Sequence, residues 1–122
     1  MKNLEPIYSI NFDRVARSSK KITYLIYHYT GMKSESKAIE RLLNKKSKVS
    51  CHYFIKKNGT IITMVPDKFV AWHAGISCWK KDKNLNNKSI GIEIHNSGHL
   101  NNYPQFTKNQ IKSTLYLTKI LK

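Results

Sequence analysis

The chain has 122 residues, of which 40% are hydrophobic and 11% aromatic, and its 22 lysines and arginines against 7 acidic residues give a formal net charge of +15. This length allows one domain with a hydrophobic core, and the aromatic content is too high for a disordered chain. No apolar stretch approaches the roughly 18 residues of a membrane-spanning helix, and the N-terminal residues lack the apolar segment of a signal peptide. We therefore expect a soluble, cytoplasmic domain.

The positive charge has two interpretations. Most of the basic residues are lysines scattered in pairs, whereas an arginine-rich stripe is typical of a surface that reads phosphates. We favour a solvated lysine-rich surface and keep a basic nucleic-acid-binding domain as an alternative, because charge alone indicates only non-specific attraction. The two cysteines, Cys51 and Cys78, form no C-x-x-C pair and are expected to be idle thiols in a reducing compartment.

The N-terminal half predicts an arm, a strand and a helix. The arm comprises residues 1–19. The run from Ile22 to His28 is apolar on both faces, as in a strand that is covered on both sides. From Ser34 to about Asn44 apolar residues recur with helical spacing, and Ser34 is a favourable N-cap. A strand followed by a helix is therefore expected.

A hairpin is predicted in the middle of the chain. The pair Asn58-Gly59 stands between the apolar runs 52–55 and 61–65. This arrangement indicates a type I′ turn, which needs positive φ at both central residues. Residues 67–88 that follow are predicted to form a loop.

A strand and a helix complete the pattern. Residues 89–95 alternate strictly, which places three isoleucines on one face and Gly91, Glu93 and His95 on the other. One face is expected to belong to the core and the other to a site. The segment from Thr107 to Gln110 is a capping box, and an amphipathic helix follows it. The spacing thus predicts an α/β domain with a groove lined by histidine and glutamate.

Two residues stand out as candidates for chemistry. His28 ends an apolar strand, at the edge where open α/β sheets bind their ligands. Glu93 lies among isoleucines, where a carboxylate is costly to bury without a partner, a metal or a catalytic role. A histidine hydrogen-bonded at the rim of the core and a glutamate paired with a lysine remain the alternatives.

Other histidines and a tryptophan are weaker candidates. Trp72 and His73 offer a flat aromatic ring beside a titratable imidazole, which suits sugar rings and peptides, although a loop tryptophan is commonly a lid over the core. His52 is weaker still, and His99 is interpreted as solvated. The sequence has no H-E-x-x-H motif and no Cys or His pair with zinc-finger spacing.

Taken in order, the motifs resemble those of the zinc-dependent N-acetylmuramoyl-L-alanine amidases. This family includes the anhydro-muropeptide amidases of bacterial cell-wall recycling, phage lysozyme-type amidases and peptidoglycan recognition proteins. The matching segments are Leu25–Gly31, Val49–Ile55, Lys57–Ile61, Val65–Asp67, Ala71–Gly75, Ser89–Asn96 and Pro104–Gln110. The resemblance implies an amidase-like domain over residues 20–122, with a mixed central β-sheet flanked by α-helices.

The resemblance also implies a reaction and roles for residues. The reaction is hydrolysis of the amide between the lactyl group of N-acetylmuramic acid and the L-alanine of a peptidoglycan fragment or muropeptide. His28 matches the first ligand of a single zinc ion, and Glu93 matches the general base of the recycling branch. Cys51 stands where the phage branch has a tyrosine, so that tyrosine's role is not transferred. The substrate-binding candidates are Trp72, His73, His52 and His95.

One departure from the family is informative. In the family the second histidine ligand, the third ligand and a lysine that stabilises the oxyanion follow the long helix, and this chain ends at Lys122. Residues 1–122 therefore supply one of three expected ligands and lack the family's last strand and helix. We expect a truncated, inactive member with an exposed sheet edge and an apolar helix face prone to aggregation.

Two other functions remain open. They are a non-catalytic peptidoglycan-binding module that retains the groove without metal, and the basic nucleic-acid-binding domain. The sequence does not distinguish soluble muropeptides from the intact wall as the substrate, and it does not indicate an oligomeric state.

Overall fold

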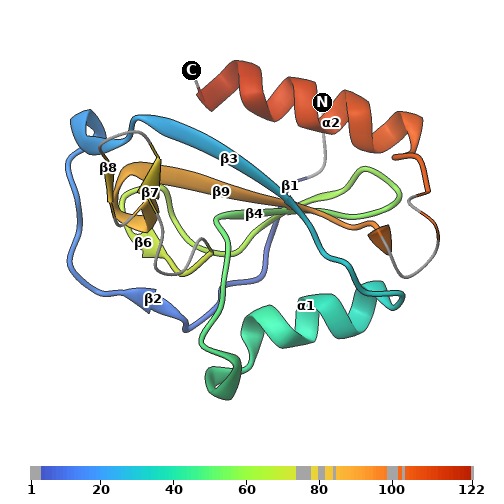
Figure 1. Cartoon of the computed structure of the whole chain (residues 1–122), viewed down its shortest axis with the longest axis horizontal. Coiled ribbons are helices and arrows are strands. Elements are labelled where there is room, and N and C mark those ends of the chain that lie inside the picture. The colour runs from blue at the N-terminus through green and yellow to red at the C-terminus, as the bar shows by residue number, and fades with distance from the viewer. Residues whose placement is uncertain are drawn as a thin grey trace.

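The fold is a mixed sheet with a helix on each face. The computed structural model describes residues 4–73, 85–98, 102 and 104–121, and the backbone of residues 78–79 and 82–83. The five strands lie in the order β1-β5-β4-β9-β3. They are β1 (Leu4–Pro6), β3 (Tyr24–Tyr29), β4 (Tyr53–Ile55), β5 (Ile61–Thr63) and β9 (Ser89–Ile94). Helices α1 (Glu35–Leu43) and α2 (Lys108–Leu121) lie on opposite sides of this sheet (Figure 1), as predicted.

The strand pairing is parallel except in the hairpin. β4 and β5 are antiparallel, whereas β9 is parallel to both β4 and β3. β1, which belongs to the predicted N-terminal arm, pairs in parallel with β5 and extends the sheet. None of the described helices has both the length and the apolar character needed to cross a membrane.

The segment 67–88 contains more structure than predicted. β6 (Val70–Ala71) pairs with β2 (Phe12–Asp13), and β7 (Cys78–Trp79) pairs with β8 (Asp82–Lys83). A 3-10 helix, Leu85–Lys88, leads into β9. The prediction of a loop was wrong here because strands of two residues carry no periodicity that a sequence pattern could reveal.

Each face of the sheet packs its own core. The cluster under α1 consists of Ala38, Leu42, Cys51, Phe54, Ile62 and Met64. The cluster under α2 consists of Ile55, Ile61, Ile90, Ile92, Ile94 and Leu117. The three isoleucines of β9 therefore share the α2 face, as their alternation predicts. The buried Cys51 thiol has a pKa raised well above its ordinary value by burial.

The predicted caps begin both helices. The Ser34 hydroxyl accepts a hydrogen bond of 3.2 Å from the backbone N–H of Lys37, at the start of α1. In the capping box, the Thr107 N–H donates to the Gln110 side chain at 3.0 Å, and the Gln110 N–H donates to the Thr107 hydroxyl at 3.1 Å. These contacts satisfy N–H groups that have no partner within the helix.

The hairpin is present, but its turn differs from the predicted type I′. Gly59 has a φ of 92°, whereas Asn58 is not among the residues with positive φ. The Gly59 N–H donates to the Lys56 carbonyl, and the Lys56 N–H donates to the Thr60 carbonyl, each at 2.8 Å. This pattern is typical of a three-residue loop in which a type I turn is followed by a glycine bulge.

β3 is less covered than its apolar sequence predicts. It lies at the end of the sheet, and Tyr27 and Tyr29 are 44% and 47% exposed. Beside it the outer face of α2 exposes Ile111, Leu115 and Ile120. The expectation of a strand covered on both sides was therefore wrong for the described chain, whereas the expected exposed sheet edge and apolar helix face are present.

We expect this apolar surface to cause self-association. Leu115 is 66% exposed and lines an apolar cavity of about 250 Å³ with Tyr27 and Ile111, so a lysine at position 115 places a charge where copies would meet. Leu115→Lys should lower the apparent molecular mass at high concentration in sedimentation or light scattering. Val15→Lys, at an 81% exposed site in the N-terminal arm, is the matched control. If both variants had the same effect, or if neither had any effect, the assignment of self-association to this surface would be contradicted.

Candidate active site

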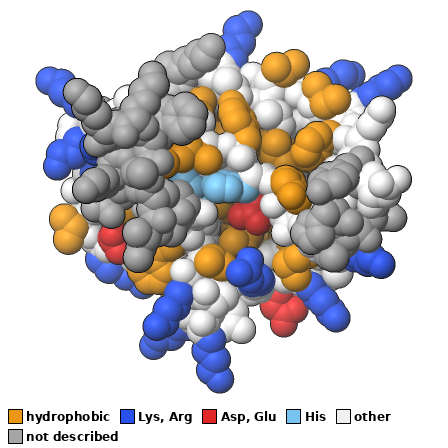
Figure 2. Space-filling view, in the orientation of Figure 1, with side chains coloured by type: hydrophobic (Ala, Val, Ile, Leu, Met, Phe, Trp, Pro, Cys, Tyr) orange, Lys and Arg blue, Asp and Glu red, His pale blue; other side chains and the backbone are white. Residues whose placement is uncertain are grey.

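The two strongest candidates lie side by side. In the parallel pairing of β3 with β9, His28 is the partner of Glu93, and Phe54 of β4 is the partner of Glu93 on its other side. Strand partners project from the same face, so His28 and Glu93 share the face on which Phe54 packs under α1. Figure 2 shows a histidine surface and an acidic surface next to each other near the centre of the molecule. The face of β9 on which the sequence predicts a site therefore brings His28 and Glu93 next to each other, and their roles stay a prediction.

Glu93 carries a partly buried carboxyl group with a raised pKa. Burial raises the pKa of its carboxyl group to about 7, and the positive charge of Arg41 partly opposes this shift. Within the described residues its carboxylate has no hydrogen bond and no ion pair, so the alternative of a lysine salt bridge has no support there. A carboxyl group with a pKa near 7 can both accept and release a proton at neutral pH.

His73 packs directly between β9 and His28. A Cβ atom on Gly91 would lie 2.4 Å from the Cγ atom of His73, so only glycine at position 91 admits this ring. His73 Nδ1 lies 3.0 Å from His28 Nε2, and His73 Nε2 lies 2.9 Å from the hydroxyl oxygen of Ser89. The space that Gly91 leaves on the site face is thus filled by His73.

His52 lies inside the protein. It is fully buried, its Nδ1 accepts the N–H of Gly91 at 3.0 Å, and its Nε2 donates to the carbonyl of Phe69 at 2.8 Å. Burial lowers the pKa of its imidazole to about 4. The structure therefore gives His52 a buried position beside Gly91 of β9, and not the surface position that a substrate contact requires.

The buried histidines predict a loss of stability in acid. An unfolded histidine has a pKa of about 6.5, whereas His52 stays neutral down to about pH 4, so below pH 6.5 the unfolded chain binds more protons and stability falls. The loss from His52 alone should reach about 3 kcal/mol near pH 4. Urea titrations at pH 7, 5.5 and 4 measure it. His52→Gln should remove this part of the pH dependence, and an unchanged dependence in that variant would contradict the assignment.

Sequence reasoning missed Arg17, which fastens three segments around the site. Its guanidinium group donates to the carbonyls of Asp67, Asn86 and Ser89, and the distances range from 2.8 to 3.3 Å. Its Nη2 also lies 3.3 Å from His52 Nε2. No pattern around Arg17 signals this role, because all its partners lie 35 or more positions away.

Trp72 lies on the same side of the fold as the N-terminal arm. Its indole N–H donates to the carboxylate of Asp13 at 2.9 Å, and its backbone pairs with Ser50. Trp72 is partly exposed. It therefore remains available for a substrate contact, which is a prediction that these bonds do not test.

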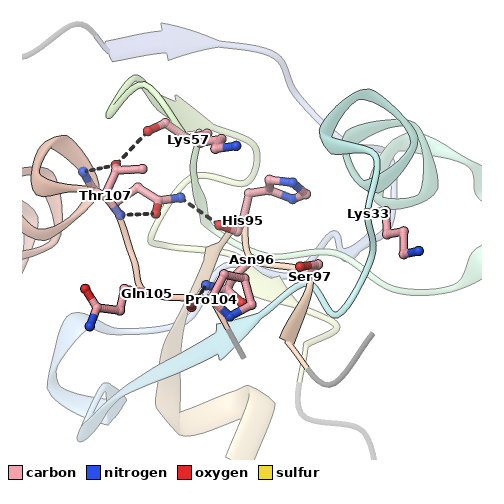
Figure 3. Close-up of a pocket in the computed structure, with 9 residues that line it drawn as sticks. Lys33, Lys57, His95, Asn96, Ser97, Pro104, Gln105 and Thr107 are labelled. Atoms are coloured by element: carbon pink, nitrogen blue, oxygen red, sulfur yellow. Dashed lines mark hydrogen bonds between the residues drawn. The ribbon is translucent and has the colours of Figure 1, made fainter. Parts of the chain in front are cut away.

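His95 lines a separate cavity at the end of β9. The cavity has a volume of about 290 Å³, and Lys33, Lys57 and Thr107 also line it (Figure 3). His95 is 8% exposed, and its Nδ1 lies 3.0 Å from the Thr30 hydroxyl. Burial lowers the pKa of this imidazole, so the positive charge of the cavity comes from the two lysines.

The described residues do not form a complete metal site. No group of three or more His, Cys, Asp or Glu side chains within the described ranges could hold a metal ion. His28 fits as one ligand, because its Nε2 bonds to His73 while its Nδ1 has no hydrogen bond within those ranges. His99 and the side chain of Cys78 lie outside the described residues.

Comparison with known proteins decides the family. The family described as N-acetylmuramoyl-L-alanine amidase matches residues 18–122. The chain belongs to this amidase family. It is 37% identical over 99 residues to the N-acetylmuramoyl-L-alanine amidase AmiD of Escherichia coli (strain K12). This alignment covers 75% of this chain and 35% of AmiD. The 1,6-anhydro-N-acetylmuramyl-L-alanine amidase AmpD of Citrobacter freundii is 40% identical over 53 residues, or 43% of this chain and 28% of AmpD.

Solved amidase structures share the fold. A crystal structure of AmpD superposes with a TM-score of 0.80 at 21% identity and covers 99% of this chain and 74% of that one. Escherichia coli AmiD, in complex with anhydro-N-acetylmuramic acid-L-Ala-D-γ-Glu-L-Lys, superposes with a TM-score of 0.73 at 32% identity, over 83% of this chain and 43% of AmiD. The chain thus spans about a third of the length of the curated relatives that it matches.

Proposed function

We propose that this amidase-family protein hydrolyses the amide bond between the lactyl group of N-acetylmuramic acid and L-alanine. The observation that carries the proposal is the state and position of the Glu93 carboxyl group. Its pKa is about 7, and Glu93 lies opposite His28 on the neighbouring parallel strand. Family membership and the AmiD and AmpD relatives support the same reaction.

Glu93 would move the proton that the reaction requires. Its ionised carboxylate accepts a proton as a water oxygen bonds to the carbonyl carbon of the amide. The protonated carboxyl group then donates this proton to the nitrogen of L-alanine, and the carbon–nitrogen bond breaks. The sugar leaves as a lactyl carboxylic acid and the peptide leaves with a free amino group, so one water molecule is consumed.

His28 would bind the zinc ion that the family resemblance implies. When bound, zinc polarises the amide carbonyl and lowers the pKa of a water molecule to about 7. His28 is the one ligand that the described residues offer, and the other ligands would come from outside those residues. Its partial burial lowers the pKa of the imidazole, which favours the neutral ring that a metal needs.

The proposed substrate is a muropeptide of the kind present in the AmiD complex. Trp72 is partly exposed and offers an aromatic surface for a sugar or peptide. Lys33 and Lys57, in the cavity beside His95, offer positive charge to the carboxylates of a stem peptide. His73 would act indirectly, through His28, because its two ring nitrogens both form hydrogen bonds within the protein.

A peptide-release assay tests the proposal. The protein, at the length that its gene encodes, is mixed with anhydro-N-acetylmuramyl-L-Ala-D-γ-Glu-L-Lys and zinc, and released peptide is measured by mass spectrometry. Release that a chelator stops and zinc restores is the expected result. No release, or release that a chelator leaves unchanged, would contradict the proposal.

A non-catalytic muropeptide-binding module is the second candidate. It is favoured by one observation, that the described residues provide no group of three metal ligands. Calorimetry with the same muropeptide distinguishes the two. Binding that a chelator does not affect, together with no peptide release, would support the binding module.

A further inference from the structure

A chain of hydrogen bonds joins the start of β9 to His28. The Ser89 hydroxyl donates to the carbonyl of Leu85 at 2.6 Å and lies 2.9 Å from His73 Nε2. His73 Nδ1 lies 3.0 Å from His28 Nε2. Two side chains, Ser89 and His73, thus connect a buried backbone carbonyl to the histidine that we propose as a metal ligand.

The positions of the protons in this chain follow from its first member. A hydroxyl group has one proton, and Ser89 gives it to Leu85, whose carbonyl oxygen can only accept. His73 Nε2 must therefore carry a proton and donate it to Ser89. In a neutral imidazole the other nitrogen is then an acceptor, so His73 Nδ1 accepts from His28 Nε2. His28 is left with its proton on Nε2 and a lone pair on Nδ1.

We infer that His73 and Ser89 are positioning residues that hold His28 in the tautomer with a free lone pair on Nδ1. This inference rests on the proposed function, since it names Nδ1 as the atom with which His28 would bind zinc. A hydrogen bond on the second nitrogen of a ligating histidine commonly fixes the ring and its tautomer. Here a second histidine supplies that acceptor.

The packing around His73 holds its ring in place within this chain of hydrogen bonds. The backbone N–H of His73 donates to the Asn86 side chain at 3.2 Å, and the ring lies against Gly91, where no Cβ would fit. Its ring centroid lies 5.3 Å from that of His28, with an interplanar angle of 67°. His73 therefore presents Nδ1 to His28 from one direction only.

Nuclear magnetic resonance of the histidine rings tests the inference without metal or substrate. Long-range proton–nitrogen correlation spectra of the nitrogen-15-labelled chain show which ring nitrogen carries the proton. In the wild-type chain we expect His28 and His73 both to be protonated on Nε2. In Ser89→Ala we expect the single tautomer of His28 to be lost, with the Nδ1 signal shifted toward that of a protonated nitrogen.

Matched variants separate positioning from stability. Ser113→Ala removes another fully buried serine, which donates to the Gly59 carbonyl under α2, and should leave the His28 signals unchanged. His73→Asn keeps an acceptor near the position of Nδ1 and should retain the wild-type tautomer of His28, whereas His73→Leu should lose it. These two variants decide the outcome if Ser89→Ala does not fold.

The inference is overturned if wild-type His28 carries its proton on Nδ1, or if His73→Leu leaves its tautomer unchanged. Peptide release from the muropeptide is measured separately. The tautomer result can therefore fail while release succeeds, and release can fail while the tautomer result holds.

Discussion

Glu93→Gln is expected to slow peptide release by a factor of about 10² to 10⁴, because glutamine fills the same space but cannot accept the proton of water. In the wild-type protein, release should rise as the pH increases through about 7, where Glu93 becomes ionised. Initial rates between pH 5.5 and 8.5 measure both effects. The variant should lose this rise together with its activity.

The same substitution should stabilise the fold. An unfolded glutamate ionises near pH 4.5, whereas folded Glu93 holds its proton to about pH 7, so stability falls as the pH rises between these values. Glutamine removes this cost. The free energy of unfolding at pH 8 should increase by about 2 kcal/mol, because glutamine carries no charge that burial penalises.

Glu40→Gln is the matched control for both measurements. Glu40 lies on the exposed face of α1 and loses the same charge, so it should change neither peptide release nor stability beyond about 0.5 kcal/mol. If Glu93→Gln released peptide at the wild-type rate, Glu93 would not be the base. If it were less stable than wild type at pH 8, the carboxylate would have a stabilising partner.

Gly91→Ala should have the second-largest effect. The added methyl group would occupy a point 2.4 Å from His73 Cγ, so the ring must move away from Gly91, which disturbs its contact with His28. Overpacking of this kind costs about 1–3 kcal/mol. Displacement of a ring that supports a ligand by about 1 Å should also slow peptide release by up to about 100-fold.

A double-mutant cycle shows whether the clash is the cause. His73→Ala removes the ring, so adding Gly91→Ala to it should cost much less than Gly91→Ala costs in the wild-type background. Chemical denaturation gives the four free energies of unfolding. Equal costs in both backgrounds would show that Gly91 matters for a reason other than the His73 ring.

The sequence predicts the local elements well where a short pattern determines them. The alternation of residues 89–95 correctly places Ile90, Ile92 and Ile94 in one core, because strand neighbours alternate whatever the rest of the chain does. Ser34 and the Thr107–Gln110 capping box mark the helix starts, because these contacts span only three residues. Such features depend on backbone geometry alone.

The features that the sequence does not predict depend on distant segments. β1 joins the sheet through residues 57 positions away, and Arg17 binds carbonyls from 50 to 72 positions along the chain. His52 and His73 are both weak candidates in the sequence, yet one is buried beside Gly91 of β9 and the other contacts His28. Only the folded register distinguishes them.

The sequence predicts only part of the candidate site, because some of its residues give a local signal and others do not. Glu93 and His28 stand out because each is a polar residue in an apolar strand, and the parallel register then makes them partners. Ser89 gave no such signal, since a serine at the start of a strand is ordinary. The link from Ser89 through His73 to His28 appears only when the three side chains are placed together.

The masses of the products formed from anhydro-N-acetylmuramyl-L-Ala-D-γ-Glu-L-Lys test the central claim most directly. The account predicts two products from the wild-type protein, the anhydro sugar with an intact lactyl acid and the tripeptide with a free L-alanine amino group. From Glu93→Gln it predicts the same two products at a rate about 10² to 10⁴ times lower. Cleavage at a peptide bond within the stem, or product formation at the same rate by both proteins, would contradict it.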